Sequence, residues 1–156
     1  SSDLSWSWIA DRIMLSLASE SAGGASTILE KTVAYTKERV QFGKTIASYQ
    51  AIKHKCADLL TQVESAKTLT YYAAWALSDA GLDSSDEASI AAAMAKSYTT
   101  DAYKTCTAEA IQTHGAIGFT WEMPIHLYYK RARANAISIA TSNQLRDNLI
   151  QKVVAA

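Results

Sequence analysis

Apolar residues recur at helical spacing over four long stretches of this chain, and only three short irregular segments separate those stretches. No run alternates β-branched and polar residues as a half-buried strand does. A helix with one apolar face must bury that face against neighbouring elements. The pattern therefore predicts an all-α fold, namely an up-and-down antiparallel four-helix bundle with short connections.

The first expected helix runs from about Trp6 to Lys37 and contains two adjacent glycines, Gly23 and Gly24. Each glycine inside a helix costs roughly 1 kcal/mol relative to alanine. We expect a neighbouring helix to pack closely at this turn, and the alternatives are a bound ligand or two glycines that are merely tolerated. The apolar stripe of this helix comprises Ile9, Ile13, Leu17, Ile28 and Val33.

The second expected helix begins after Ser48, which can act as its N-cap, and ends near Gly81, which can act as its C′ residue. A polar turn over residues 83–87 leads into a third, alanine-rich helix that reaches about Thr113. The buried stripe of the second helix is expected to comprise Ile52, Cys56, Leu59, Val63, Ala66, Leu69, Ala73 and Leu77.

The fourth expected helix starts near Pro124, because proline is favoured at early helical positions, and it runs towards the C-terminus. We expect an interruption between Ser138 and Asn143, where β-branched and polar residues lower the helix propensity. The apolar spacing resumes at Leu145.

The composition describes one soluble globular domain over residues 1–156, with 49% apolar residues and fifteen Lys and Arg against fifteen Asp and Glu. This charge balance gives no reason to expect a nucleic acid or an anionic membrane as partner. Trp6, Trp8 and Trp75 lack the basic neighbours of a nucleobase platform and are expected in the core. No apolar run approaches the length of a membrane span, and no signal peptide is evident, so we expect a cytoplasmic protein.

Residue types that often carry chemistry are present without the spacing that the chemistry needs. His54, His114 and His126 have no partner at metal-ligand spacing, and no Glu-x-x-His pair suits a di-metal centre. We expect no metal site, and each histidine should be a surface or hydrogen-bonded residue. Cys56 and Cys106 form no CxxC motif and are expected to be buried thiols.

Two irregular segments carry a more specific pattern. The motif Arg-x-Gln-Phe-Gly occupies residues 39–43, and the motif Gln-x-His-Gly-x-x-Gly-Phe occupies residues 112–119. Gly-Phe-Thr-Trp-Glu at 118–122 and Lys-Arg-Ala at 130–132 follow in order. With these motifs, nearly the whole chain resembles the C-terminal helical domain of the acyl-CoA dehydrogenases.

The resemblance implies an FAD enzyme that oxidises the α,β carbon–carbon bond of an acyl-CoA thioester and passes electrons to an electron-transferring flavoprotein. It also implies that the Arg39 region reaches the FAD of a neighbouring subunit, and that the Gly115 turn meets the adenosine half of that FAD. The implied cofactor-binding residues are Arg39, Gln41, Phe42, Gln112, Gly115, Ala116, Thr141 and Asn143.

The chemistry of the matched residues suits this role, because a pyrophosphate accepts hydrogen bonds from a guanidinium fork and from free backbone N–H groups. The alternative is structural: Arg39 would pair with an acid at a helix end, and Gly115 would only cap a helix. Where the family usually has a second glycine, this chain has Ala116. Its methyl group should be tolerated if φ stays negative, although it would hinder the closest phosphate approach.

No catalytic base can be named from the sequence. The family's usual glutamate aligns with the Ile139-Ala140 pair, and its alternative position on the first helix aligns with Ile13-Met14. Asp11 lies two residues before Ile13, and two residues turn a helix by about 200°, so its carboxylate should point to the opposite side. Arg12 is a candidate for a contact with CoA.

The family's N-terminal helical domain and middle β-domain have no counterpart in residues 1–156. We therefore expect one domain of a longer dehydrogenase, inactive alone, in a homo- or hetero-oligomer. Similar chains without the glutamate often work as paired unlike subunits, in which one chain supplies the base. The alternative is a non-catalytic helical interaction module, or a partner subunit of such a heteromeric enzyme.

Overall fold

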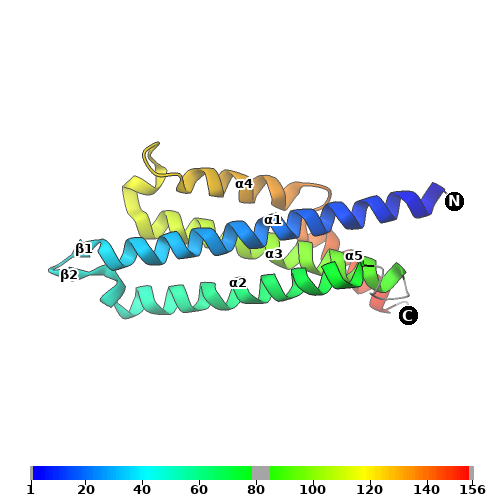
Figure 1. Cartoon of the computed structure of the whole chain (residues 1–156), viewed down its shortest axis with the longest axis horizontal. Coiled ribbons are helices and arrows are strands. Elements are labelled where there is room, and N and C mark those ends of the chain that lie inside the picture. Colours follow the sequence, from blue (N-terminus) through cyan, green and yellow to red (C-terminus); the bar gives the residue numbers. More distant parts are fainter. Residues whose placement is uncertain (1, 79–84, 155–156) are drawn as a thin grey trace.

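The computed structural model describes residues 2–78 and 85–154, and this part of the chain is helical apart from short connections. In Figure 1, α1 and α3 run in one direction along the long axis and α2 runs in the opposite direction. Helices α4 and α5, which both pack on α3, together take the fourth position. The prediction of an all-α, up-and-down four-helix bundle is confirmed. The helices are α1 (Ser2–Glu38), α2 (Gln50–Ala76), α3 (Ser85–His114), α4 (Ile125–Ile137) and α5 (Ser142–Val154).

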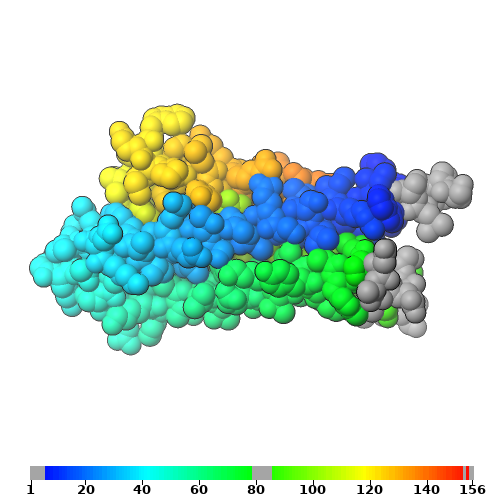
Figure 2. Space-filling model, in the orientation of Figure 1, coloured from blue at the N-terminus to red at the C-terminus, as the bar shows by residue number. Residues whose placement is uncertain are grey.

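The third helix, α3, is the centre of the bundle and contacts every other α-helix. Its alanines make this possible, because small side chains let the neighbouring backbones approach. The alanines of α3 that are buried are Ala88, Ala91, Ala92, Ala93, Ala95, Ala102 and Ala110. Figure 2 shows the face on which α1 and α2 lie side by side along the length of the molecule.

Close packing at the glycine pair of α1 is confirmed for one of the two residues. A Cβ atom on Gly24 would lie 2.5 Å from Cζ of Tyr103, a buried residue of α3. A Cβ atom on Gly23 would meet nothing within 4 Å. The approach of α1 to α3 therefore requires glycine at position 24 only.

Two expected helix ends differ from the structure. Ser48 is not the N-cap of α2: it lies in the 3₁₀ turn η1 (Ile46–Ser48), where its hydroxyl donates to the Thr45 carbonyl oxygen at 2.7 Å. Tyr49 takes the N-cap position without a side-chain hydrogen bond. Helix α2 ends at Ala76, and Gly81 lies outside the described residues.

The observed start and interruption of the fourth helix lie close to the predicted ones. Pro124 stands directly before α4, at its N-cap, rather than in its first turn. The expected break is confirmed, because α4 ends at Ile137 and α5 begins at Ser142. At Ile139 the backbone φ is 66°, which a β-branched residue rarely adopts.

Several aromatic and apolar residues that were expected in the core are exposed. Trp6 is 72% exposed, and Trp8 and Trp75 are about half exposed. Ile9 and Ile13 are exposed as well. The predictions for these residues were wrong because Met14 and the small Ala18 form the inward side of this part of α1. Within residues 2–78 and 85–154, no helix combines the length and the hydrophobicity that crossing a membrane requires.

Cys106 is a buried thiol of α3, as expected, whereas Cys56 is only half-buried. Burial raises the pKa of Cys106 from 9.0 to about 12. The folded protein therefore keeps this proton between pH 9 and 12, while the unfolded chain releases it. Stability from the protonated thiol is present below pH 9 and decreases as the pH rises towards 12.

Cys106→Ala should therefore reduce the loss of stability at alkaline pH. The variant has no thiol proton to release on unfolding. Its free energy of unfolding should therefore fall less steeply with pH than that of the wild type, by about 1.4 kcal/mol per pH unit between pH 9 and 12. The measurement is urea unfolding of both proteins under reducing conditions across this range. Parallel pH profiles for the two proteins would contradict the assignment.

Candidate functional site

A short hairpin follows α1 and presents the first sequence motif. Strand β1 (Val40–Gln41) pairs antiparallel with β2 (Lys44–Thr45). The connecting residues Phe42 and Gly43 have φ values of 53° and 79°, and a type I′ turn requires positive φ at both central positions. The Phe42 side chain is 93% exposed at the tip of this hairpin.

Arg39 joins α1 to the hairpin. Its backbone N–H donates to the Tyr35 carbonyl oxygen at 2.9 Å, and its own carbonyl accepts from the Ile46 N–H at 2.8 Å. These bonds fix the backbone of Arg39, while its side chain is exposed. Among the described residues, its guanidinium group has no hydrogen bond or ion pair, so the expected alternative of a partner acid is not observed.

The second motif forms the end of α3. Gly115 has a φ of 67° directly after His114, so glycine there also serves as the helix cap. The chain continues as the 3₁₀ turn η2 (Gly115–Phe119). Ala116 has no positive φ, so its methyl group is tolerated. Gly118 is required, since a Cβ atom there would lie 2.9 Å from the Ile111 carbonyl oxygen.

The two motifs meet at one end of the bundle, where Figure 1 shows the hairpin and the segment after α3 close together. The rings of Tyr35 and His114 are stacked with centroids 4.1 Å apart. The Tyr35 hydroxyl donates to the His114 carbonyl oxygen at 3.5 Å. We call the surface formed by residues 39–43 and 112–116 the hairpin end.

A cavity with a volume of ≈ 470 Å³ lies at the hairpin end, beside η2. Its polar side chains are the Gln112 amide and the Tyr129 hydroxyl, and the remainder is mainly apolar. Such a lining suits a flat, mostly apolar group that forms a few directed hydrogen bonds. The lining residues are Ala108, Ile111, Gln112, Gly115, Ala116, Phe119 and Tyr129, of which Phe119 and Tyr129 were not among the expected site residues.

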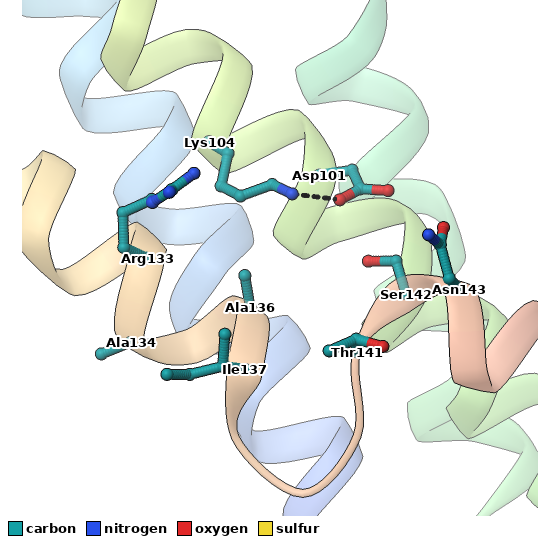
Figure 3. A pocket seen from close by; sticks show the side chains of 9 residues that line it. All are labelled: Asp101, Lys104, Arg133, Ala134, Ala136, Ile137, Thr141, Ser142 and Asn143. Carbon is teal, nitrogen blue, oxygen red and sulfur yellow. Dashed lines mark ion pairs between the residues drawn. The ribbon is translucent and has the colours of Figure 1, made fainter.

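A second cavity of ≈ 400 Å³, the α4–α5 cavity, lies between α3, α4 and α5 (Figure 3). Thr141 and Asn143 line it, together with the cationic side chains of Lys104 and Arg133, which the sequence did not single out. The ammonium group of Lys104 lies 2.9 Å from a carboxylate oxygen of Asp101.

Asp101 is the anion of this cavity and also forms an ion pair with Arg146 of α5 at 2.5 Å. Burial works to raise the pKa of Asp101, but hydrogen bonds from Lys104, Arg146 and Ser142 bring it below its ordinary value of 3.8. The carboxylate is therefore charged at neutral pH and compensates part of the positive charge in the cavity.

The expected cofactor-binding residues thus fall into two groups within one chain. Six lie at the hairpin end, and Thr141 and Asn143 lie in the α4–α5 cavity. Asp101 and Gln112, which line the two cavities, are about 16 Å apart along α3, at a rise of about 1.5 Å per residue. One chain therefore does not bring all eight residues to a single place.

Both positions that align with the family's glutamate, Ile13 and Ile139, carry exposed apolar side chains. The residues that follow them, Met14 and Ala140, pack in the same hydrophobic cluster. Helix α1 is continuous through Asp11, without the local bulge that would redirect its carboxylate. Asp11 is instead buried and accepts a hydrogen bond from the Ser89 hydroxyl at 2.5 Å.

Arg12 and the histidines also make contacts within the chain. The guanidinium group of Arg12 lies 3.7 Å from the ring centroid of Trp8. Nδ1 of His114 and Nδ1 of His126 bond to backbone carbonyl groups, and exposed His54 contacts the Gln50 amide. In the described part of the chain, no cluster of His, Cys, Asp or Glu could hold a metal ion.

Comparison with known proteins identifies the family. Residues 11–154 match the family described as "Acyl-CoA dehydrogenase, C-terminal domain". Acyl-CoA dehydrogenase IpdE2 of Mycolicibacterium smegmatis is 43% identical over 129 residues, which cover 82% of this chain and 38% of that protein. The caffeyl-CoA reductase–Etf complex subunit CarC of Acetobacterium woodii is 38% identical over 128 residues, which cover 82% of this chain and 32% of that protein.

The fold comparison agrees. The solved butyryl-CoA dehydrogenase of Megasphaera elsdenii superposes with a TM-score of 0.87 at 28% identity, covering 95% of this chain and 38% of that one. The chain therefore spans less than half of the length of these relatives. It belongs to the acyl-CoA dehydrogenase family and corresponds to the C-terminal helical domain of that family.

Proposed function

We propose that this chain forms the C-terminal part of an FAD-dependent acyl-CoA dehydrogenase, which oxidises the α,β bond of an acyl-CoA thioester. Members of the family are FAD-dependent flavoproteins. The observation that carries the proposal is the hairpin end, where an unpaired, exposed guanidinium group and a left-handed glycine turn lie at the same end of the bundle. The buried Nε2 of His114, without a hydrogen-bond partner in the described part of the chain, adds a polar atom at the same end.

In this proposal each group of the hairpin end has a separate task. The Arg39 guanidinium would hold the pyrophosphate of FAD. Gln112 and the backbone of Gly115 and Ala116 bind the adenosine half in the cavity beside η2. The exposed Phe42 ring and the neighbouring Gln41 cover the cofactor from the hairpin. FAD, when bound, accepts the hydride from Cβ of the acyl group.

The separation of the two cavities supports a cofactor site shared between subunits. The hairpin end of one chain would bind the adenosine pyrophosphate, while Thr141 and Asn143 of another chain would lie near the flavin. Exposed apolar residues such as Trp6, Trp8 and Tyr71 are available to contact other parts of the assembly. We therefore propose a homo- or hetero-oligomer, active in lipid metabolism in the cytoplasm, with an electron-transferring flavoprotein as acceptor.

A second candidate function is a partner subunit that binds FAD without supplying the base. It is favoured by Ile13 and Ile139, which stand at the two positions where a carboxylate would be needed. An apolar side chain cannot remove the α-proton, so another chain would provide the carboxylate. The relative CarC, whose name describes it as a subunit of a complex with Etf, is consistent with such an arrangement.

The proposal is tested on the protein purified in its native assembly. We expect bound FAD and loss of its visible absorption band when a suitable acyl-CoA from a chain-length series is added without an acceptor. An assembly without flavin, even after incubation with FAD, would contradict the proposal. Bound FAD that no acyl-CoA reduces would favour the partner-subunit function.

Gln112→Ala should weaken FAD binding by about fivefold, because it removes one hydrogen bond between neutral groups. Thr113→Ser is the matched control: its hydroxyl can still donate to the Glu109 carbonyl oxygen, and residue 113 does not line the cavity. FAD titration of the apo-assembly measures both dissociation constants. Equal dissociation constants for wild type and Gln112→Ala would remove Gln112 from the site.

A further inference from the structure

Lys96 of α3 is a lysine with 0% exposure, and the FAD-binding role proposed above does not use it. Its ammonium group donates to the carbonyl oxygen of Ala136 at 3.2 Å and to that of Ala140. It forms no hydrogen bond with a carboxylate in the described part of the chain. A buried cation is costly unless it is well bonded, and here burial lowers the pKa of Lys96.

The two carbonyl groups that bind Lys96 lie on either side of an unusual turn. The Ala140 N–H donates to the Ser138 carbonyl oxygen at 2.8 Å, which closes a three-residue turn around Ile139. With a φ of 66° at its central residue, this is the rare form of that turn. A β-branched residue keeps this conformation only where its surroundings impose it.

The turn leads directly into the residues that line the α4–α5 cavity. The backbone N–H and the hydroxyl of Thr141 both donate to Oε1 of Gln144, which fixes the first turn of α5. The Ser142 hydroxyl donates to the Ser97 carbonyl oxygen at 3.2 Å, next to Lys96 on α3. Figure 3 shows Thr141, Ser142 and Asn143 together at the edge of this cavity.

We propose that Lys96 is a positioning residue of the cofactor site. By binding the Ala136 and Ala140 carbonyl groups, it holds the turn around Ile139 and thereby places Thr141 and Asn143 against the ligand of the α4–α5 cavity. The proposal rests on the proposed function only for the identity of that ligand, which is the flavin half of FAD. Lys96 itself lies behind the turn and contacts no ligand.

The test compares two probes, FAD and ADP, on the apo-form of the native assembly. ADP carries only the half of FAD that we assign to the hairpin end. Lys96→Met, which keeps the length of the side chain and removes the cation, should raise the dissociation constant of FAD about tenfold or more. It should leave that of ADP unchanged, and Lys96→Arg should recover part of the loss.

Val63→Ala is the control for a general loss of stability, because Val63 is buried in the core cluster around Leu59 and Ile28, which does not include Lys96. We expect Val63→Ala to destabilise the protein and to keep FAD binding. An equal loss of FAD binding in Val63→Ala and Lys96→Met would overturn the positioning role. So would an unchanged dissociation constant of FAD in a folded Lys96→Met protein.

If Lys96→Met does not fold, amide hydrogen exchange of the unmodified protein tests the same coupling. Exchange at Ala140 should slow when FAD binds and should not change with ADP. Unchanged exchange with FAD would overturn the proposal. Failure of the proposed function gives a different result, because wild-type protein would then bind neither ADP nor FAD.

Discussion

Gly24→Ala should destabilise the protein by about 2 kcal/mol, the usual range for overpacking a core. The added methyl group would lie 2.5 Å from Cζ and 2.6 Å from the hydroxyl oxygen of Tyr103. Tyr103 is 2% exposed and belongs to the main core cluster, so its ring cannot move aside without disturbing its neighbours. Helix α1 must therefore shift away from α3, or the Tyr103 ring must lose its packing.

Gly23→Ala is the matched control, one residue earlier in the same helix. Its new methyl group meets nothing within 4 Å, so the higher helix propensity of alanine should stabilise the protein by up to about 1 kcal/mol. Thermal or urea unfolding of both variants measures the difference. Similar effects of the two substitutions would show that Tyr103 does not restrict the approach of α1 to α3.

Arg39→Ala should raise the dissociation constant of FAD by about 10- to 150-fold. Hydrogen bonds to charged groups contribute about 1.5–3 kcal/mol, and each 1.4 kcal/mol corresponds to a factor of ten in affinity. The fold should be unaffected, because the contacts that hold Arg39 in the structure come from its backbone. Titration of the apo-assembly with FAD, by flavin fluorescence, measures the change.

Lys53→Ala is the control for the loss of a positive charge. Lys53 is exposed in the first turns of α2, at the same end of the bundle as Arg39, but outside the hairpin and the cavity beside η2. A general electrostatic attraction would weaken FAD binding equally in both variants and would decrease with added salt. A specific pyrophosphate contact predicts a much larger effect for Arg39→Ala.

Most of the fold could be predicted from the sequence, because periodic apolar residues specify which segments are helical. The interruption of the fourth helix was also predictable, since weak helix formers between Ser138 and Asn143 coincide with it. The helix ends were less predictable. Ser48 has a good N-cap side chain, yet its hydroxyl bonds locally in η1, and Tyr49 takes the N-cap position without any side-chain bond.

Burial was harder to predict than helicity. Ile9 and Ile13 have the spacing of a buried stripe, but periodicity does not show which side of a helix finds a partner. The small residues Ala18 and Gly24 form the inward side of α1 because α3 approaches so closely there. In the N-terminal part of this helix, Ile9 and Ile13 therefore lie on the outer side.

The candidate site was predictable only through its motifs. Arg-x-Gln-Phe-Gly and Gln-x-His-Gly-x-x-Gly-Phe indicated which residues to consider, and the structure brings these two segments to one end. The positive φ of Phe42 and Ile139 had no local signal, because neither residue type favours that conformation. The role of Lys96 depends on carbonyl groups about forty residues later in the chain, which no sequence pattern relates to it.

The most direct test of the central claim is a crystal structure of the native assembly grown with FAD. We predict that the FAD pyrophosphate lies within about 3 Å of the Arg39 guanidinium nitrogens, with the adenosine beside Gln112 and Gly115. The flavin should lie near Thr141 and Asn143 of another chain. FAD bound away from the hairpin end, with Arg39 still free, would contradict the account.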